Sequence, residues 1–338
     1  MGKIAFLYPG QGSQKLGMGD ELARTCPALF EQYMAQCDVV SGMPITRYCL
    51  EGPVNALNQT NIAQPALFAH SLALTDYAQQ LGLYPDLVAG HSLGEYTAAV
   101  VAGALSFEEG LYLVCQRGKL MYQVQEKQPG TMAAVLGLPT ETLVDICTAI
   151  SKKHFVTVTN WNTHTQLVVS GVEEGVEELM EAVRSYETAR TMRLPVKGAF
   201  HSALMSPVQD VLKEIMQDLT WNNTSVPLVA NVSGKALTRN YQIQQELIAQ
   251  IVNPVRWVTC IETLLEAGCD TFVELGSSQV LTRLTNRIAP GTKAFAVDTP
   301  EKVVALVETL RGVDVQEQAA NMCVPGCPYP ASTHIGIN

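Results

Sequence analysis

The sequence contains 338 residues, of which 47% are hydrophobic and 16% charged, and its formal net charge is −10. This length and apolar content predict a well-buried core in one large domain or about two ordinary ones, and they exclude an intrinsically disordered chain. The acidic balance argues against nucleic-acid binding, which needs a concentrated basic face, and no apolar run approaches the ~20 residues of a membrane span.

The N-terminal part of the chain alternates short apolar runs with helical patterns. Two apolar runs that end at turn residues predict buried strands over 3–8 and 85–90. Helices are predicted over 17–37, 64–82, 92–105 and 106–125. Strands that alternate with helices predict a mostly parallel sheet with helices on both faces.

The order of the predicted elements changes near Pro129. The next patterns indicate a strand, a helix, two strands, a helix and a strand, over 131–137, 140–151, 155–162, 165–171, 172–186 and 189–196. This β-α-β-β-α-β order is typical of a small ferredoxin-like unit. After it, a helix and two strands are predicted over 202–219, 271–276 and 293–298.

These patterns together predict an α/β fold with an insertion. We expect an α/β-hydrolase-like large domain with a parallel sheet, built from residues 1–128 and 198–312, and a ferredoxin-like subdomain over 129–197. Residues 313–338 contain three prolines and no apolar period, and they predict a disordered tail or linker outside the core.

The stretch Gly90-His91-Ser92-Leu93-Gly94 places a serine between two glycines where a predicted strand meets a predicted helix. In that context G-x-S-x-G indicates a nucleophile, because glycines permit the tight turn and the helix N-terminus offers N–H groups beside the serine oxygen. Serine is also a favoured helix N-cap, so the residue pattern alone leaves both roles open.

A serine hydroxyl needs a base to become a useful nucleophile. Of the six histidines, His201 lies where the chain leaves the predicted insertion and re-enters the large domain, and such junctions line clefts. A helix-capping or surface role is the alternative for His201. His91 adjoins Ser92, but on a tight turn its side chain is expected to point elsewhere.

Arg117 lies within the broad apolar arc of its predicted helix, together with Leu111, Val114 and Met121. A charge in such a position is costly unless it is paired. The residues alone leave two explanations open, a side chain that snorkels to the edge of the helix or a pair with a structural glutamate.

Six motifs, taken in chain order, resemble the malonyl-CoA:acyl-carrier-protein transacylases and the related free-standing or polyketide-synthase acyltransferases. The resemblance covers roughly residues 3–312, and its motifs are PGQGSQ at Pro9–Gln14, AQPAL at Ala63–Leu67, GHSLGEY at Gly90–Tyr96, QRGKLM at Gln116–Met121, FHSALM at Phe200–Met205 and QIVNPVRW at Gln250–Trp257. Six motifs in the family's order are far more specific than any one of them, and they favour the catalytic roles of Ser92 and His201 over capping roles.

The resemblance implies a reaction through an acyl-serine ester. Ser92 would take the acyl group, and His201 would accept the hydroxyl proton and later return it. A neutral carbonyl near Gln250 would orient the imidazole in place of an acid. The backbone N–H groups of Gln11 and Leu93 would form the oxyanion hole.

The same resemblance implies the acyl group. The guanidinium of Arg117 would grip the malonyl carboxylate with two parallel hydrogen bonds. Met121 and Phe200 would line the acyl pocket, and Phe200 is typical of malonyl-type domains. Asn160 and Gln166 match polar positions of the inserted unit and either line the cleft or are ordinary surface amides.

The predicted function is transfer of malonyl from malonyl-CoA to the phosphopantetheine thiol of an acyl carrier protein, with no cofactor or metal bound by the enzyme. Phe200 stands where many fatty-acid enzymes have serine, which favours a polyketide assembly line over fatty-acid synthesis. Carrier proteins are usually acidic, so a local basic cluster is expected to steer docking, against the alternative of an ordinary solvated surface. The two candidate clusters are Arg190, Arg193 and Lys197, and Arg283, Arg287 and Lys293.

Three other functions are weaker. An acyl hydrolase that clears stalled carrier proteins would generally lack Arg117, and a non-catalytic docking module would have lost Ser92 or His201. A general esterase of the α/β-hydrolase type would lack the inserted unit.

Cysteine usage and the N-terminus predict the compartment. Nine scattered cysteines favour reduced thiols, and the first residues lack the apolar core of a signal peptide, so we expect a cytoplasmic protein. We also expect a monomer without a membrane or nucleic-acid partner. The one close pair, Cys323 and Cys327, has only His334 nearby, which is too few ligands for a metal site.

Overall fold

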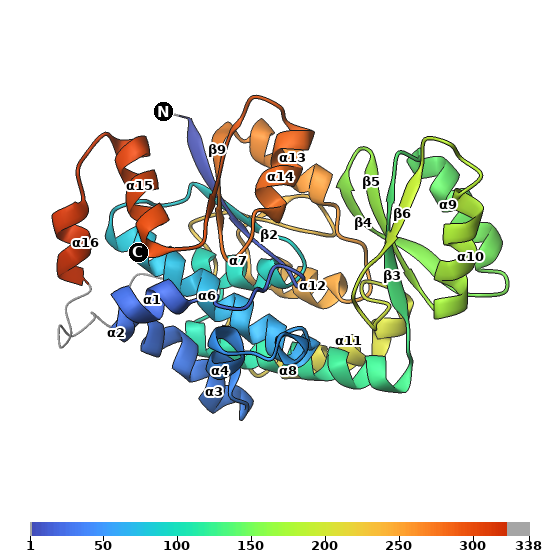
Figure 1. The fold of residues 1–338 in the computed structure, drawn as a ribbon, viewed down its shortest axis with the longest axis horizontal. Helices are drawn as coiled ribbons and strands as arrows, with labels where there is room; N and C mark the ends of the chain where they lie inside the picture. The colour runs from blue at the N-terminus through green and yellow to red at the C-terminus, as the bar shows by residue number, and fades with distance from the viewer. Residues whose placement is uncertain (1, 323–338) are drawn as a thin grey trace.

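The computed structural model describes residues 2–322, which form two β-sheets and the helices around them (Figure 1). The larger sheet has six strands in the order β10-β9-β1-β2-β7-β8, and its neighbours are parallel except β7 with β8. The strands are β1 Lys3–Tyr8, β2 Leu87–Gly90, β7 Leu228–Val229, β8 Ala236–Leu237, β9 Cys269–Leu275 and β10 Lys293–Val297. Strands β1, β2, β9 and β10 overlap the strands that the sequence predicts.

The central strands of this sheet are buried because helices cover both of its faces. In β1, Phe6 and Tyr8 belong to one hydrophobic cluster while Ala5 and Leu7 belong to another, as the two-residue period of a strand requires. The first cluster includes side chains of α6 (Thr60–Gln80), α7 (Leu93–Ala102) and α8 (Phe107–Lys127), and the second includes side chains of α13 (Trp257–Glu266) and α14 (Val280–Ile288). The chain therefore has the predicted α/β architecture, with a mixed sheet of mostly parallel strands.

The second sheet has four antiparallel strands in the order β4-β5-β3-β6 and lies at the right of Figure 1. Its strands are β3 Thr131–Leu136, β4 Val156–Thr163, β5 Gln166–Gly171 and β6 Arg190–Arg193, and α9 (Thr140–Ile150) and α10 (Glu173–Val183) enclose a separate core with it. On the opposite face Met132, Ala134 and Val168 join the core of the larger sheet. This face forms one wall of the cavity described below.

The N-terminal helical region corrects one prediction. The single helix expected over 17–37 is divided at Cys26, because Pro27 has no N–H and disfavours a helical conformation in the residue before it. The remaining helices are α1 Asp20–Thr25, α2 Pro27–Phe30, α3 Gln36–Ser41, α4 Ile45–Leu50, α5 Val54–Leu57, α11 Ser206–Ile215, α12 Asn240–Gln250, α15 Pro300–Arg311 and α16 Gln316–Met322. A π-helical turn at Glu31–Ala35 joins α2 to α3.

Helix α16 also corrects the predicted tail. The expectation that residues 313–338 lie outside the core is wrong for 313–322, where Val315 and Ala319 are buried against the main core. Ala319 is the one buried residue of α16, so the sequence carries no apolar period there. Residues 323–338 lie outside the described residues.

Two further observations apply to residues 2–322. No helix in this range is long and apolar enough to cross a membrane. No group of three or more histidine, cysteine, aspartate or glutamate side chains in it is arranged to hold a metal ion. Cys323, Cys327 and His334 lie outside the described residues.

Candidate active site

Ser92 stands at the sharp turn between β2 and α7, with φ of 54° and ψ of −107°. Such a backbone conformation is strained in a residue other than glycine and is typical of a nucleophile on a strand-to-helix turn. A Cβ atom on Gly94 would lie 2.0 Å from the carbonyl oxygen of Tyr8, and one on Gly90 would lie 1.9 Å from the carbonyl carbon of Gly94. The Ser92 side chain makes no capping hydrogen bond to α7, so capping does not explain this serine.

His201 lies on the loop that follows β6, and its imidazole joins two other parts of the chain. Its Nε2 is 2.7 Å from Ser92 Oγ, and its Nδ1 is 2.8 Å from the backbone oxygen of Gln250 at the end of α12. Because a carbonyl oxygen only accepts hydrogen bonds, Nδ1 carries the hydrogen and the unprotonated Nε2 faces the hydroxyl. His201 is therefore neither a cap nor a surface residue.

The surroundings of His201 keep its imidazole neutral. Burial, followed by the positive charge of Arg117, lowers the pKa of His201 to about 3. At neutral pH the ring is therefore in the form that accepts a proton, as a general base requires.

Arg117 reaches the same point from α8. Its Nη2 donates to Ser92 Oγ at 3.2 Å and to Gln250 Oε1 at 3.0 Å, and its Nη1 donates to Gln64 Oε1 at 2.8 Å. The guanidinium carbon lies 5.0 Å from the centre of the Tyr96 ring. All of these partners are neutral, so they hold the guanidinium in place without compensating its charge.

The charge of Arg117 is buried without an acidic partner. The side chain is 1% exposed, its Nε has no hydrogen-bond partner, and no carboxylate of residues 2–322 lies within ion-pair distance. Burial lowers the pKa of Arg117, which is the cost of keeping this cation away from water. Neither snorkelling nor a structural glutamate pair describes this residue.

The two backbone donors that the sequence predicts belong to residues around Ser92. Leu93 follows Ser92 and is the first residue of α7, and Gln11 lies on the loop after β1 and lines the cavity that contains Ser92. Within residues 2–322 neither backbone N–H forms a hydrogen bond. Both donors are free to bind an oxyanion.

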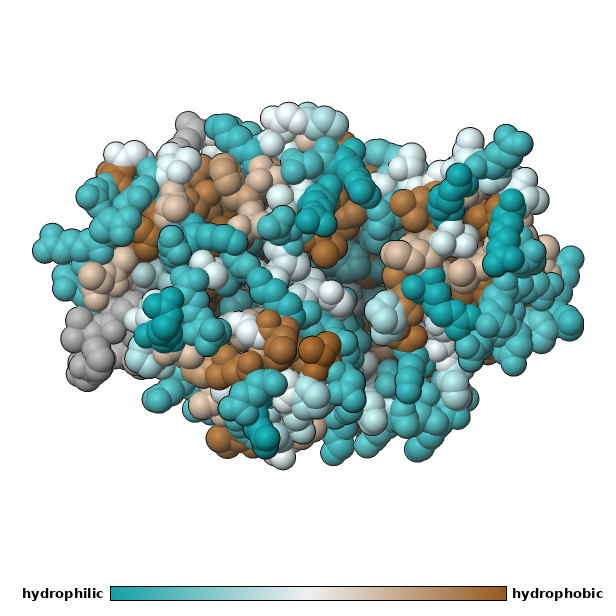
Figure 2. Space-filling view, viewed as in Figure 1, coloured by the Kyte–Doolittle hydropathy of each residue, from teal (hydrophilic) through white to brown (hydrophobic). Residues whose placement is uncertain are grey.

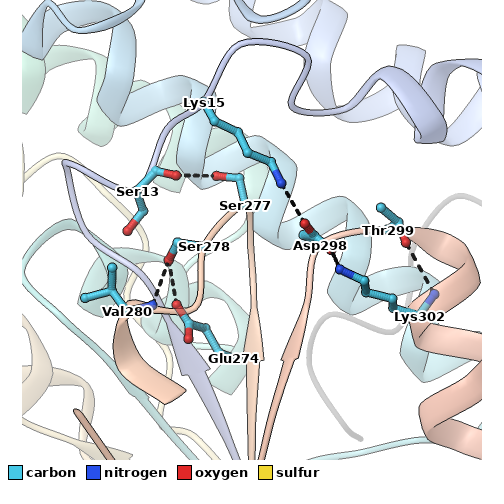
Figure 3. A network of polar contacts seen from close by, with 9 residues as sticks. All are labelled: Ser13, Lys15, Glu274, Ser277, Ser278, Val280, Asp298, Thr299 and Lys302. Carbon is cyan, nitrogen blue, oxygen red and sulfur yellow. Dashed lines mark hydrogen bonds and ion pairs between the residues drawn. The ribbon is translucent and has the colours of Figure 1, made fainter. Parts of the chain in front are cut away.

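Residues that follow β9 and β10 hold the loop that carries Gln11 (Figure 3). The hydroxyl of Ser277 donates to the backbone oxygen of Ser13 at 2.8 Å, and Lys15 Nζ lies 2.6 Å from Asp298 Oδ2. These contacts fix the loop through both its backbone and a side chain. The position of Gln11 therefore does not depend on a hydrogen bond from its own N–H.

Ser92, Arg117 and His201 border one cavity of about 240 Å³. Figure 2 shows the surface hollowed between the part of the molecule with the larger sheet and the part with the four-stranded sheet. Of the sequence-predicted residues, those that line the cavity are Gln11, Ser92, Arg117, Met121, Asn160, Gln166, Phe200 and His201. Leu93 and Gln250 are 1% and 0% exposed and do not line it.

Sequence reasoning missed several side chains that fix this geometry. Asn231 accepts a hydrogen bond from the Ser92 N–H at 2.8 Å and donates to the Gly90 carbonyl at 2.7 Å. His91, which lies next to the nucleophile, instead has Nε2 2.9 Å from Asn162 Oδ1. No local pattern around Asn231 or Asn162 signals these contacts.

Comparison with known proteins identifies the family. Residues 5–316 match the acyl transferase domain. The chain is 38% identical to the malonyl CoA-acyl carrier protein transacylase of Bacillus subtilis, over 92% of this chain and 98% of that protein. The chain belongs to the malonyl CoA-acyl carrier protein transacylase family. The Escherichia coli transacylase is 36% identical, over 91% of this chain and all of that protein.

Solved structures of this transacylase family share the fold. An acyl carrier protein S-malonyltransferase from Vibrio cholerae superposes with a TM-score of 0.85 at 37% identity, over 90% of this chain and 99% of that one. A malonyl-transacylase in complex with its type II PKS acyl-carrier protein superposes with a TM-score of 0.86 at 35% identity, over 91% and 99% of the two chains. The family that the six motifs predict is thereby confirmed.

The neutral state of His201 predicts an unusual pH dependence for this transacylase. Because its pKa is about 3, well below 6.5, kcat/KM for acylation by acetyl-CoA should stay level from neutral pH down to about pH 5. Arg117→Met removes the positive charge, which is one of the two main causes of the low pKa of His201. That pKa should therefore rise, and the acid limb of the pH profile should move to higher pH. Rapid-quench acylation followed by mass spectrometry measures both profiles, and a wild-type acid limb near the ordinary histidine pKa would contradict this assignment.

Proposed function

We propose that the chain transfers a malonyl group from malonyl-CoA to the phosphopantetheine thiol of an acyl carrier protein through a malonyl-Ser92 ester. The observation that carries this proposal is the buried Arg117, whose Nη2 is 3.2 Å from Ser92 Oγ and which lacks an acidic partner among residues 2–322. An acyl group with an acid end supplies the missing carboxylate. The names of the relatives agree with this substrate.

In the first half-reaction Ser92 Oγ attacks the thioester carbonyl carbon while His201 Nε2 takes the hydroxyl proton. The N–H groups of Gln11 and Leu93 stabilise the oxyanion. The carbon–sulfur bond then breaks, and the proton on Nε2 passes to the sulfur of coenzyme A. In the second half the carrier thiol gives its proton to Nε2, its sulfur attacks the ester carbonyl, and the Ser92 oxygen leaves and regains the proton.

The cavity wall supports the choice of a small, acid-tailed acyl group. Met121 and Phe200 are 2% and 6% exposed and line the space beside Arg117 as the acyl pocket. Phe200 leaves little room for an α-methyl branch, which favours malonyl over methylmalonyl. Asn160 and Gln166 line the cavity from the four-stranded sheet and offer polar contacts to the rest of the donor.

The alternative functions are less well supported. A hydrolase of neutral acyl groups would have no use for an uncompensated buried cation beside the nucleophile. A non-catalytic docking module would not need a hydroxyl and an imidazole 2.7 Å apart. The product serves polyketide or fatty-acid synthesis, and Phe200 favours the polyketide pathway. The monomeric state and cytoplasmic location stay predictions.

The finer description of the fold belongs to the same proposal. The four-stranded sheet has strand order β4-β5-β3-β6 and two helices on one face, which supports a ferredoxin-like subdomain over 129–197. The parallel strands and the serine on a strand-to-helix turn support an α/β-hydrolase-like large domain over 1–128 and 198–312.

The structure favours one of the two basic clusters as the carrier-protein surface. Arg193 is paired with Glu173 and Glu177, which reduces its attraction for an acidic partner. In the other cluster Arg283 and Arg287 are exposed on α14, and no acid of residues 2–322 pairs with them. The same helix lines the cavity through Val280, Leu281 and Leu284, so an acidic carrier bound there would bring its thiol close to the cavity that contains Ser92.

The covalent intermediate is tested by mass. Wild-type protein mixed with malonyl-CoA should gain a malonyl group that peptide mapping places on Ser92, and Ser92→Ala should gain none and transfer at no more than about a thousandth of the wild-type rate. A Ser92→Ala variant that labels and transfers like the wild type would refute the mechanism.

The carboxylate site is tested by substrate preference. In Arg117→Ala, kcat/KM for malonyl-CoA should fall by about a hundredfold or more, because the malonyl carboxylate loses a bidentate buried partner, while acetyl-CoA should become relatively better. Arg117→Lys is the matched control, since it keeps the charge but loses the fork and should fall in between. An unchanged ratio of the two kcat/KM values in Arg117→Ala would rule out the carboxylate clamp.

The docking surface is tested by charge reversal. Arg283→Glu combined with Arg287→Glu should raise the KM for holo acyl carrier protein about tenfold at low salt, and the difference should shrink as ionic strength rises. Arg190→Glu serves as the control because this residue is an exposed arginine of the other cluster. Equal effects from both variants would show that docking does not depend on α14.

A further inference from the structure

Glu95 is a buried acid that the reaction scheme above does not use. It lies in the first turn of α7, three residues after Ser92, and is 0% exposed. Its Oε1 accepts a hydrogen bond from the backbone N–H of Asn231 at 2.8 Å, and its Oε2 accepts one from Gln250 Nε2 at 2.5 Å. A carboxyl group is rarely buried so completely unless each oxygen has a partner, and here both do.

The partners of Glu95 contact three groups of the site. Asn231 fixes the N–H of Ser92, and Gln250 places its backbone oxygen on His201 and its side-chain amide between Ser92 and Arg117. A single carboxylate thus reaches the nucleophile, the base and the cation, each through one intervening residue.

The amide of Gln250 has only one favourable orientation. Its Nε2 donates to the Ser92 carbonyl at 2.8 Å and to Glu95, while its Oε1 accepts from Arg117 Nη2 at 3.0 Å. Reversing the amide would face N–H against the guanidinium and oxygen against both acceptors. Glu95 favours the orientation that presents an oxygen to Arg117.

The proposed role of Glu95 depends on its oxygens as hydrogen-bond acceptors. Burial, followed by the nearby Glu246, raises the pKa of Glu95 well above its ordinary value, and the hydrogen bonds from Asn231 and Gln250 and the charge of Arg117 oppose that shift only in part. Because each carboxyl oxygen has two lone pairs, both oxygens can accept their N–H hydrogen bonds in either protonation state.

The interposed amide also explains why Arg117 remains available. A glutamate in direct contact with the guanidinium would form an ion pair and occupy the position that a substrate carboxylate needs. With Gln250 between them, Glu95 forms no direct ion pair with Arg117, and Arg117 stays among the residues that line the cavity.

We propose, on the basis of the malonyl transfer proposed above, that Glu95 is a positioning residue which sets the Gln250 amide so that Arg117 is held to receive the acid end of the acyl group. Glu95 touches neither substrate nor reacting atom. Its loss should therefore affect the choice between acidic and neutral acyl groups more than it affects the chemistry at Ser92.

The first test is the isosteric change Glu95→Gln. The new amide has one oxygen for two N–H donors, those of Asn231 and Gln250, so with its oxygen on the Asn231 N–H its NH2 group opposes Gln250 Nε2 and the Gln250 amide loses the contact that helps to set it. The ratio of kcat/KM for malonyl-CoA to that for acetyl-CoA should fall about ten- to a hundredfold, as expected for a lost hydrogen bond to a charged group. A correctly folded Glu95→Gln with the wild-type ratio would overturn the proposal.

Glu246→Gln is the matched control. Glu246 is also buried and acidic and lies near Glu95, one turn before Gln250 in α12, but its side chain accepts a hydrogen bond from the Val232 N–H, whereas the Gln250 amide donates to Glu95 and to the Ser92 carbonyl. Its substitution should leave the malonyl-to-acetyl ratio within about twofold of wild type. A fall as large as that of Glu95→Gln would assign the effect to buried charge in general and refute the specific role.

The second variant, Gln250→Met, tests whether Glu95 acts on Arg117 through the Gln250 amide. Its result can be interpreted even if Glu95→Gln does not fold. It removes the amide but keeps the backbone carbonyl on His201, so the malonyl-to-acetyl ratio should fall by a similar factor, and adding Glu95→Gln should lower it no further. An unchanged ratio in Gln250→Met, or a further tenfold fall in the double variant, would contradict the proposal. The wild-type malonyl-Ser92 adduct is measured separately, so failure of the transfer function itself would appear there.

Discussion

A buried positive charge without an acid beside it organises the centre of this molecule. Arg117 is held by the amide oxygens of Gln64 and Gln250 and by the hydroxyl of Ser92, none of which carries charge. Leaving a cation uncompensated in a buried site costs stability, and such strain is common where a protein keeps a group ready for a ligand. Burial, together with the same charge, keeps His201 neutral, so Arg117 contributes both to the substrate site and to the state of the base.

The fold brings these groups together by using the ends of its strands. Gln11 follows β1 and Ser92 follows β2, and the two strands are parallel neighbours, so both residues emerge at the same edge of the sheet. His201 arrives on the chain that returns from the four-stranded sheet, and Gln250 ends α12. The hydroxyl and its base therefore come from segments more than a hundred residues apart, and their 2.7 Å contact depends on how the two sheets face each other.

Local sequence patterns predicted the parts of the site that depend on local geometry. The glycines around Ser92 identify the turn because only a missing Cβ permits the approach to Tyr8, and Arg117 is conspicuous as a charge on an apolar helix face. Asn231 and Glu95 could not be found in this way, because their roles arise from contacts across more than a hundred residues and from the direction of an amide. Periodicity predicts the long strands and helices. It fails at Pro27, which divides a helix, and for α16, which has a single buried residue.

The link between Arg117 and His201 has a consequence for the proposed reaction. A histidine with a pKa of about 3 is neutral but is a weak base, since proton transfer is most efficient when the pKa lies near the working pH. Burial is the larger cause of this low pKa and the charge of Arg117 is the second. When a malonyl carboxylate pairs with Arg117, the second cause is compensated, and the pKa of His201 rises as the imidazole has to accept the Ser92 proton. An acetyl group brings no such compensation. The acid end of the substrate then contributes to the rate of acylation as well as to binding, which is how binding energy from a non-reacting group becomes selectivity in the transition state.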